Sequence, residues 1–145
     1  MTFEIVNPPS LGAPRGWNNG MLAPKDGRVL FVAGQVGLEP GAAEPPPAAP
    51  TFAAQFAAAL DRVLTVLRDA GGVPSDVGRM TVYVTDLAAY RADRVALGEA
   101  WKARFGTHYP AMALVEVAGL VDRGALVEIE ATAVIAPAAI GGTQP

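Results

Sequence analysis

The 145-residue chain contains no cysteine and a single histidine, His108. Disulfides, thiolate metal sites and a cysteine nucleophile are therefore excluded, as is any metal site built from several histidines. The carboxylates do not cluster along the chain in the manner of an oxygen-ligand metal site. We accordingly expect no metal ion and no cofactor.

Charged residues are also scarce, at 17% of the chain, and the net charge is −3. No basic stripe is available to neutralise phosphates, so we expect no nucleic-acid partner. No apolar run reaches the roughly 18 residues of a membrane-spanning helix, and the N-terminus lacks the basic and apolar regions of a secretory signal. These absences favour a soluble cytoplasmic protein that has no membrane partner.

Apolar residues, by contrast, make up 51% of the chain. Length and composition indicate one globular domain over residues 1–145, large enough to bury a core. Residues 37–50 form the one biased segment, and their prolines favour polyproline II over helix, so we expect a surface loop there. Residues 137–145 are expected to form a flexible tail.

Two stretches have the pattern of helices. Residues 51–71 repeat large apolar side chains at spacings of three and four, with Thr51 as a cap and a glycine pair at the end. A second helix is expected from about Leu87 to Phe105, with Asp86 as its cap and Gly98 marking close packing. Its expected buried positions are Val95, Leu97, Trp101 and Phe105.

Short β-branched runs predict strands at about residues 3–6, 21–23, 28–33, 80–85, 111–117 and 126–135. Lys25 to Gly27 should make a tight turn between the second and third of them. In the last strand, side-chain period two separates apolar Val127, Ile129, Ala131 and Ala133 from polar Glu128, Glu130 and Thr132.

The element order predicts an α+β fold. Strand–helix–strand units require right-handed crossovers, which place both helices on one face of the sheet. The opposite face should then expose apolar groups, and an exposed apolar face favours association between chains. We expect these groups to be Met112, Leu114 and Val82 or Tyr83.

Four segments, in the correct order, resemble the Rid (reactive intermediate deaminase, also YjgF) superfamily. They are WNNG at Trp17, VLFVAGQVG at residues 29–37, DVGRMTVYVTDL at residues 76–87, and the PAMALVEV and VEIEA runs of the last two strands. The match spans residues 14–134. It implies a two-layer chorismate-mutase-like fold, with a mixed sheet of about six strands and two helices on one face. It also implies a homotrimer whose sheets line a central barrel, with small-molecule clefts between subunits.

The resemblance departs at Met112, where the family has an arginine that binds the carboxylate of a 2-imino or 2-enamino acid. A thioether cannot replace its charge-assisted hydrogen bonds, which are worth about 1.5–3 kcal/mol each. We therefore expect poor activity toward 2-imino acids unless another cation reaches the cleft. The sequence does not place any of the candidates Arg15, Arg79, Arg94 and Arg104 there.

At the family's remaining site positions, this chain keeps some of the family's residues and replaces others. Glu128 matches the glutamate implicated in positioning the hydrolytic water, and it is our candidate acid/base. A helical asparagine of the family falls near Arg94 or Leu97. The ligand-binding candidates are Trp17 in place of tyrosine, Gly34 and Gln35 from a Ser-Gly-Gln segment, Met112, and Leu114 where cysteine is frequent.

Two functions stay open at this point. One is a divergent Rid-like enzyme that hydrolyses or tautomerises an enamine, an imine or a related small carbonyl compound in an apolar cleft. The other is a non-catalytic trimeric protein that binds a small molecule or a partner. Ribonuclease activity, which some family names carry, has no support in an acidic chain with one histidine.

Overall fold

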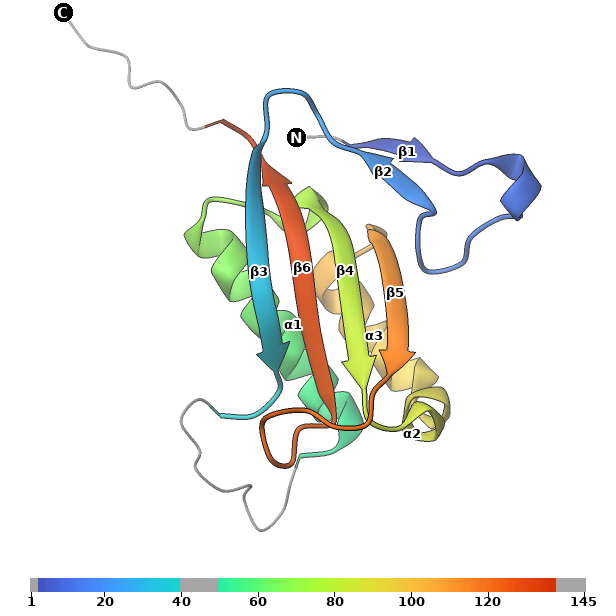
Figure 1. The fold of residues 1–145 in the computed structure, drawn as a ribbon, viewed down its shortest axis with the longest axis vertical. Coiled ribbons are helices and arrows are strands. Elements are labelled where there is room, and N and C mark those ends of the chain that lie inside the picture. The colour runs from blue at the N-terminus through green and yellow to red at the C-terminus, as the bar shows by residue number, and fades with distance from the viewer. Residues whose placement is uncertain (1–2, 40–49, 138–145) are drawn as a thin grey trace, which may run out of the picture.

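In the computed structural model, which describes residues 3–39 and 50–137, six strands and three α-helices are found (Figure 1). The strands are β1 (Glu4–Val6), β2 (Gly20–Leu22), β3 (Arg28–Val36), β4 (Val77–Val84), β5 (Ala111–Glu116) and β6 (Val127–Ile135). The helices are α1 (Phe52–Asp69), α2 (Leu87–Ala92) and α3 (Arg94–Phe105). None of these helices has the length and apolarity needed to span a bilayer.

The main sheet has the strand order β3-β6-β4-β5, with β4 and β5 parallel and the other pairs antiparallel. Strands β1 and β2 pair with each other in a separate antiparallel ribbon. The predicted α+β class is confirmed, but the six strands are divided between two sheets. The predicted turn before β3 is present, with the Gly27 amide donating to the Pro24 carbonyl at 3.4 Å, yet β2 and β3 do not pair.

Two predicted segments lie partly outside the described residues, namely positions 40–49 of the proline-rich loop and 138–145 of the tail. The start of the loop is described, and there the expected surface position is wrong. Gly37 and Leu38 are buried, and Gly37 packs against the backbone of Gln55 in α1.

Helix α1 follows the predicted pattern. The Thr51 hydroxyl accepts a hydrogen bond from the Ala54 amide at 3.2 Å, which satisfies one of the free amides at the helix start. The apolar stripe faces the sheet, and each large buried side chain contributes about 1.5–3 kcal/mol of transfer free energy. The predicted core positions that are buried here are Phe52, Phe56, Ala59, Leu60, Val63 and Leu67.

The second predicted helix is interrupted at Asp93, which separates α2 from α3. Leu97 is buried as predicted, but Val95 is 78% exposed. A helix turns about 100° per residue, so Val95 lies roughly 200° from Leu97 and cannot share its face. The prediction of close packing at Gly98 is also wrong, because a Cβ atom there would meet nothing within 4 Å.

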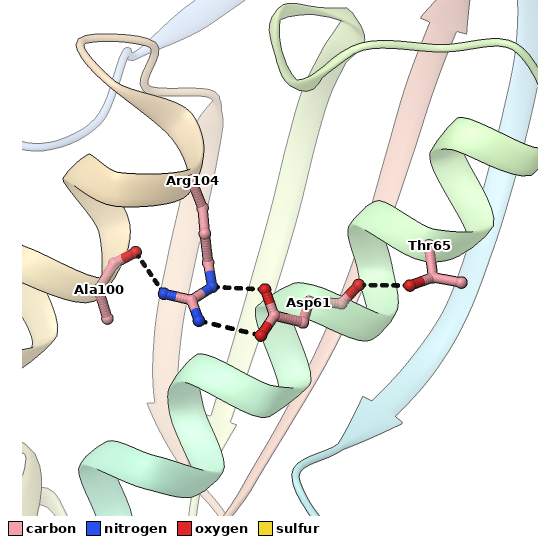
Figure 2. Close-up of polar contacts among 4 residues, drawn as sticks. All are labelled: Asp61, Thr65, Ala100 and Arg104. Carbon is pink, nitrogen blue, oxygen red and sulfur yellow. Dashed lines mark hydrogen bonds and ion pairs between the residues drawn. The ribbon is translucent and has the colours of Figure 1, made fainter.

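Helices α1 and α3 lie side by side behind the sheet and cover one of its faces (Figure 1). Figure 2 shows the polar tie between them: the Arg104 guanidinium donates to both carboxylate oxygens of Asp61, at 2.7 and 2.9 Å, and to the Ala100 carbonyl at 3.0 Å. The guanidinium hydrogen bonds lower the pKa of Asp61. This bidentate contact fixes the two helices relative to each other.

The open face of the sheet carries only one of the residues that we predicted, Tyr83, which pairs with Glu128 of β6. Val82 is fully buried against the helices, and Met112 and Leu114 pack against the same core. The residues on the open face include Phe31, which is 79% exposed, and Val115, which is 41% exposed. An exposed apolar face exists as expected, but strand β5 presents the opposite set of side chains to it.

Candidate functional site

A pocket of about 420 Å³ lies on the helix side of β4 and β5. Its volume falls in the range of small-molecule sites, and most of its lining is apolar or aromatic. Helices α1, α2 and α3, strands β4 and β5, and the segments before β2 and β5 contribute to it. The lining residues are Arg15, Gly16, Trp17, Phe56, Val82, Tyr90, Arg94, Leu97, Gly98, Trp101, Tyr109, Met112 and Leu114.

The WNNG segment anchors the N-terminal loop beside this pocket. The Asn18 amide donates to the Pro110 carbonyl at 3.1 Å, and the Asn18 side chain donates to the Tyr109 carbonyl at 2.6 Å. Asn7 donates to the Asn18 side-chain oxygen at 2.8 Å and so fixes its orientation. These contacts tie the loop to the start of β5 and set the ring of Trp17 against the pocket.

A stack of aromatic rings forms one wall of the pocket. Trp101 stacks on Tyr109 with 5.8 Å between ring centroids, and on Phe105 with 4.4 Å. The indole of Trp101 donates to the His108 carbonyl at 3.1 Å, and the His108 ring lies 2.7 Å from the Val77 carbonyl. His108 therefore holds the helix exit to the sheet and does not line the pocket.

The charged residues that line the pocket are all cationic. Arg15 from the loop and Arg94 from the first turn of α3 contribute guanidinium groups, and no carboxylate lines the pocket. Within residues 3–39 and 50–137, neither arginine takes part in an ion pair or a side-chain hydrogen bond. The sequence did not place these cations, although the family asparagine that falls near Arg94 pointed to this part of α3.

Gly34 and Glu128 come together elsewhere, on the open face of the sheet. Strand β3 has a bulge between Val32 and Gln35, so Gly34 falls outside the regular pairing with β6. A Cβ atom at Gly34 would lie only 2.0 Å from Oε1 of Glu128. The carboxylate thus lies directly over the Gly34 backbone. The Gln35 side chain donates to the Ala33 carbonyl at 3.0 Å and does not line the pocket.

A neighbouring carboxylate on the same face is already engaged. The Tyr83 hydroxyl donates to Oε1 of Glu130 at 2.9 Å, and this hydrogen bond raises the pKa of Tyr83. Beside this pair, a hollow of about 270 Å³ is lined by Phe31, Arg79 and Thr132 among others. Among the described residues, Glu130 accepts this hydrogen bond, whereas the Glu128 side chain has no hydrogen-bond partner.

The sequence-predicted site residues thus fall into two groups within one chain. Trp17, Met112 and Leu114 line the pocket, whereas Gly34 and Glu128 lie on the other face of the sheet. Strand β4 separates β6 from β5, which puts their backbones about 10 Å apart. One chain alone does not bring the glutamate to the pocket. In the described ranges, no group of three or more histidines, aspartates and glutamates could hold a metal ion.

The fold and the pocket define a small α+β protein with a ligand-sized cavity, and comparison with known proteins gives its family. The family model described as "Endoribonuclease L-PSP" matches residues 11–135. A RutC family protein of Pyrococcus abyssi is 32% identical over 121 residues, covering 83% of this chain and 90% of the relative. The chain therefore belongs to this family, the Rid/YjgF superfamily, as the sequence resemblance predicted.

Named relatives and solved structures agree with this membership. The 2-iminobutanoate/2-iminopropanoate deaminase of Escherichia coli is 34% identical over 108 residues, covering 74% of this chain and 80% of the relative. The Rid-family protein YyfB of Yersinia pestis superposes with a TM-score of 0.77 at 28% identity, covering 93% of this chain and all of that one. The YjgF product of E. coli gives 0.59 at 29% identity, covering 88% and 92%.

Proposed function

We propose that the protein is a Rid-like hydrolase of a small imine or enamine, with a reaction site completed between two chains of a homotrimer. The observation that carries this proposal is the separation of the two site groups. Glu128 covers Gly34 on the open face, while Trp17, Met112 and Leu114 line a pocket on the other face. Glu128 does not reach this pocket within its own chain, so a second chain would have to supply it.

The open face supplies a reason for the chains to associate. It exposes Val29, Phe31 and Val115, of which Phe31 is 79% exposed. Apolar groups of this size gain free energy when a neighbouring surface removes them from water, at roughly 25 cal/mol per Å² of buried apolar area. Packing three open faces together would form the central barrel implied by the family. It would also bring Glu128 of one subunit to the edge of the next.

In the proposed reaction, the Glu128 carboxylate accepts a proton from water as the water oxygen attacks the imine carbon. The C=N bond becomes a C–N bond in a tetrahedral carbinolamine. The protonated carboxyl returns this proton to the nitrogen, which becomes an amino group. The carboxylate then takes the proton of the new hydroxyl group and passes it to the nitrogen as the C–N bond breaks, so ammonia leaves and the carbonyl forms. One imine and one water give one carbonyl compound and one ammonia, and the glutamate ends in its starting state. Gly34 allows the carboxylate to lie against the strand because it has no side chain.

Met112 stands where the resemblance places the carboxylate-binding arginine. The proposed enzyme should therefore be inefficient toward 2-iminopropanoate in comparison with its relatives named as deaminases. The bidentate contact that is lost would contribute at least tenfold to binding. The alternative is a trimeric binding protein without catalysis, and the loss of that arginine is the observation that favours it.

The test compares the wild type with Glu128→Gln, using Glu130→Gln on the same strand face as the matched control. Imines generated in the assay are trapped with semicarbazide, and hydrolysis is measured as the loss of trapped product. We expect acceleration by the wild type and by Glu130→Gln, and none by Glu128→Gln. Equal rates for the wild type and Glu128→Gln would refute the enzymatic proposal and leave the binding alternative. A monomer in light scattering would refute the shared site.

A further inference from the structure

We infer that the pocket beside β5 binds an organic anion with a bulky apolar body, with Arg94 and Arg15 holding the anionic group in place of the missing arginine at Met112. This inference deepens the proposed function and rests on it to the extent that the same pocket is the substrate-binding half of the site. It changes the expected substrate from a small imine or enamine to a larger one that carries an anionic group.

The pocket carries positive charge. The chain is acidic, with a net charge of −3, yet the charged residues that line the pocket are two arginines. An arginine stays protonated at any accessible pH, so two guanidinium groups at one pocket place a fixed positive potential there. Within the described part of the chain, no carboxylate pairs with either of them. An anionic ligand would supply the missing partner.

The exposed and buried side chains of the pocket indicate how a ligand would lie in it. Arg15 and Arg94 are exposed, whereas Leu97 and Trp101 are 5% and 6% exposed. The cations therefore stand at the opening, and the apolar side chains form the floor. An anion would keep its charged group near solvent and insert its apolar part.

The volume and the lining of the pocket indicate that the ligand has a bulky apolar part. A pocket of about 420 Å³ compares with cavities that hold drug-sized ligands. Trp101 and Tyr109 lie with ring planes 3° apart, which provides a flat aromatic surface for a ring or a branched chain. Met112 adds a flexible thioether that fits irregular apolar groups. A three-carbon imino acid would leave most of this surface uncovered.

Both tryptophans of the chain, Trp17 and Trp101, line the pocket, so their intrinsic fluorescence reports binding directly. The probes are 3-phenylpropanoate and its neutral counterpart 3-phenylpropanamide, which have nearly the same size. Charge-assisted hydrogen bonds predict that the acid binds roughly ten- to a hundredfold more tightly than the amide. Equal affinities for the two probes would overturn the inference.

Substitutions of single arginines test which residues cause the preference for the acid over the amide. Arg94→Met and Arg15→Met should each weaken binding of the acid, the double variant should bring it to the level of the amide, and amide binding should not change. Arg91→Met is the matched control, because it removes the same charge three residues earlier and does not line the pocket. If Arg91→Met weakened acid binding as much as Arg94→Met, only the general field would act and the inference would fail.

The outcome is separable from that of the proposed function. Acid-selective binding without any imine turnover would leave this inference standing and refute the proposed reaction. Turnover of neutral imines without a preference for acids would leave the proposed reaction standing and refute this inference.

Discussion

Two glycines three residues apart, Gly34 and Gly37, should lose stability to different extents when they are replaced by alanine. A Cβ atom at Gly34 would lie 2.0 Å from Oε1 of Glu128, at the end of a flexible side chain. A Cβ atom at Gly37 would lie 2.1 Å from the Gln55 carbonyl oxygen and 2.4 Å from its Cα, both in the backbone of α1. The Glu128 side chain can move by rotation about its own bonds, whereas the helix backbone can move only with its packed neighbours.

The stability cost of each substitution depends on which neighbouring atoms have to move. Gly34→Ala requires Glu128 to take another rotamer or an off-rotamer angle, which costs about 0.5–1.5 kcal/mol. Gly37→Ala forces α1 away from the strand end, and overpacking of this kind costs about 1–3 kcal/mol or more. At roughly 2–4 °C of melting temperature per kcal/mol, the second variant should melt several degrees below the first. Melting is compared at one protein concentration, because assembly makes the midpoint concentration-dependent.

Imine hydrolysis should be impaired most in Gly34→Ala, although this variant is the more stable of the two. Gly34→Ala displaces the carboxylate proposed to activate water, so its imine hydrolysis should fall toward that of Glu128→Gln even though the protein is folded. Adding Glu128→Asp, which shortens the side chain by one methylene, should relieve the clash and recover part of the melting temperature. Full activity in Gly34→Ala would refute the role given to Glu128 in this position. A Gly37→Ala variant as stable as the wild type would refute the packing argument.

Two further predictions concern the supports of the pocket. The fully buried side chain of Gln55 donates to the carbonyls of Pro50 and Gly124 and accepts from the Leu126 amide. Gln55→Leu should therefore lower the free energy of unfolding, measured by urea denaturation, by about 1–3 kcal/mol for each polar group left unpaired. Asp61→Asn should cost at most about 1 kcal/mol, since the pair with Arg104 is partly exposed. Because Arg104 lowers the pKa of Asp61, the difference between wild type and Asp61→Asn in urea midpoints should be full above pH 3.8 and vanish as the pH falls through the lowered pKa.

Side-chain periodicity predicted one strand fully and another only in part. In β6 the two sets of side chains differ in polarity, so Ile129 had to face the core and Glu128 the open face. In β5 both sets are apolar, Met112 and Leu114 against Ala113 and Val115. The local sequence therefore does not reveal which set is buried. In the structure, Met112 and Leu114 pack against the core cluster between the sheet and the helices. That undetermined choice is the reason the prediction placed Met112 and Leu114 on the wrong face of the sheet.

The same reasoning explains why the cations of the pocket were not predicted. The family pattern ties carboxylate binding to one position on β5, where this chain has Met112. A ligand, however, responds to the field of all groups around it, whichever strand or helix provides them. Arg15 and Arg94 reach the pocket because Asn18 ties the N-terminal loop to the start of β5 and because the break at Asp93 sets the direction of α3. Neither feature leaves a periodic signal in the sequence. If the pocket binds an anion as we propose, substrate preference in this chain would depend on these tertiary contacts more than on the residue at the family's arginine position.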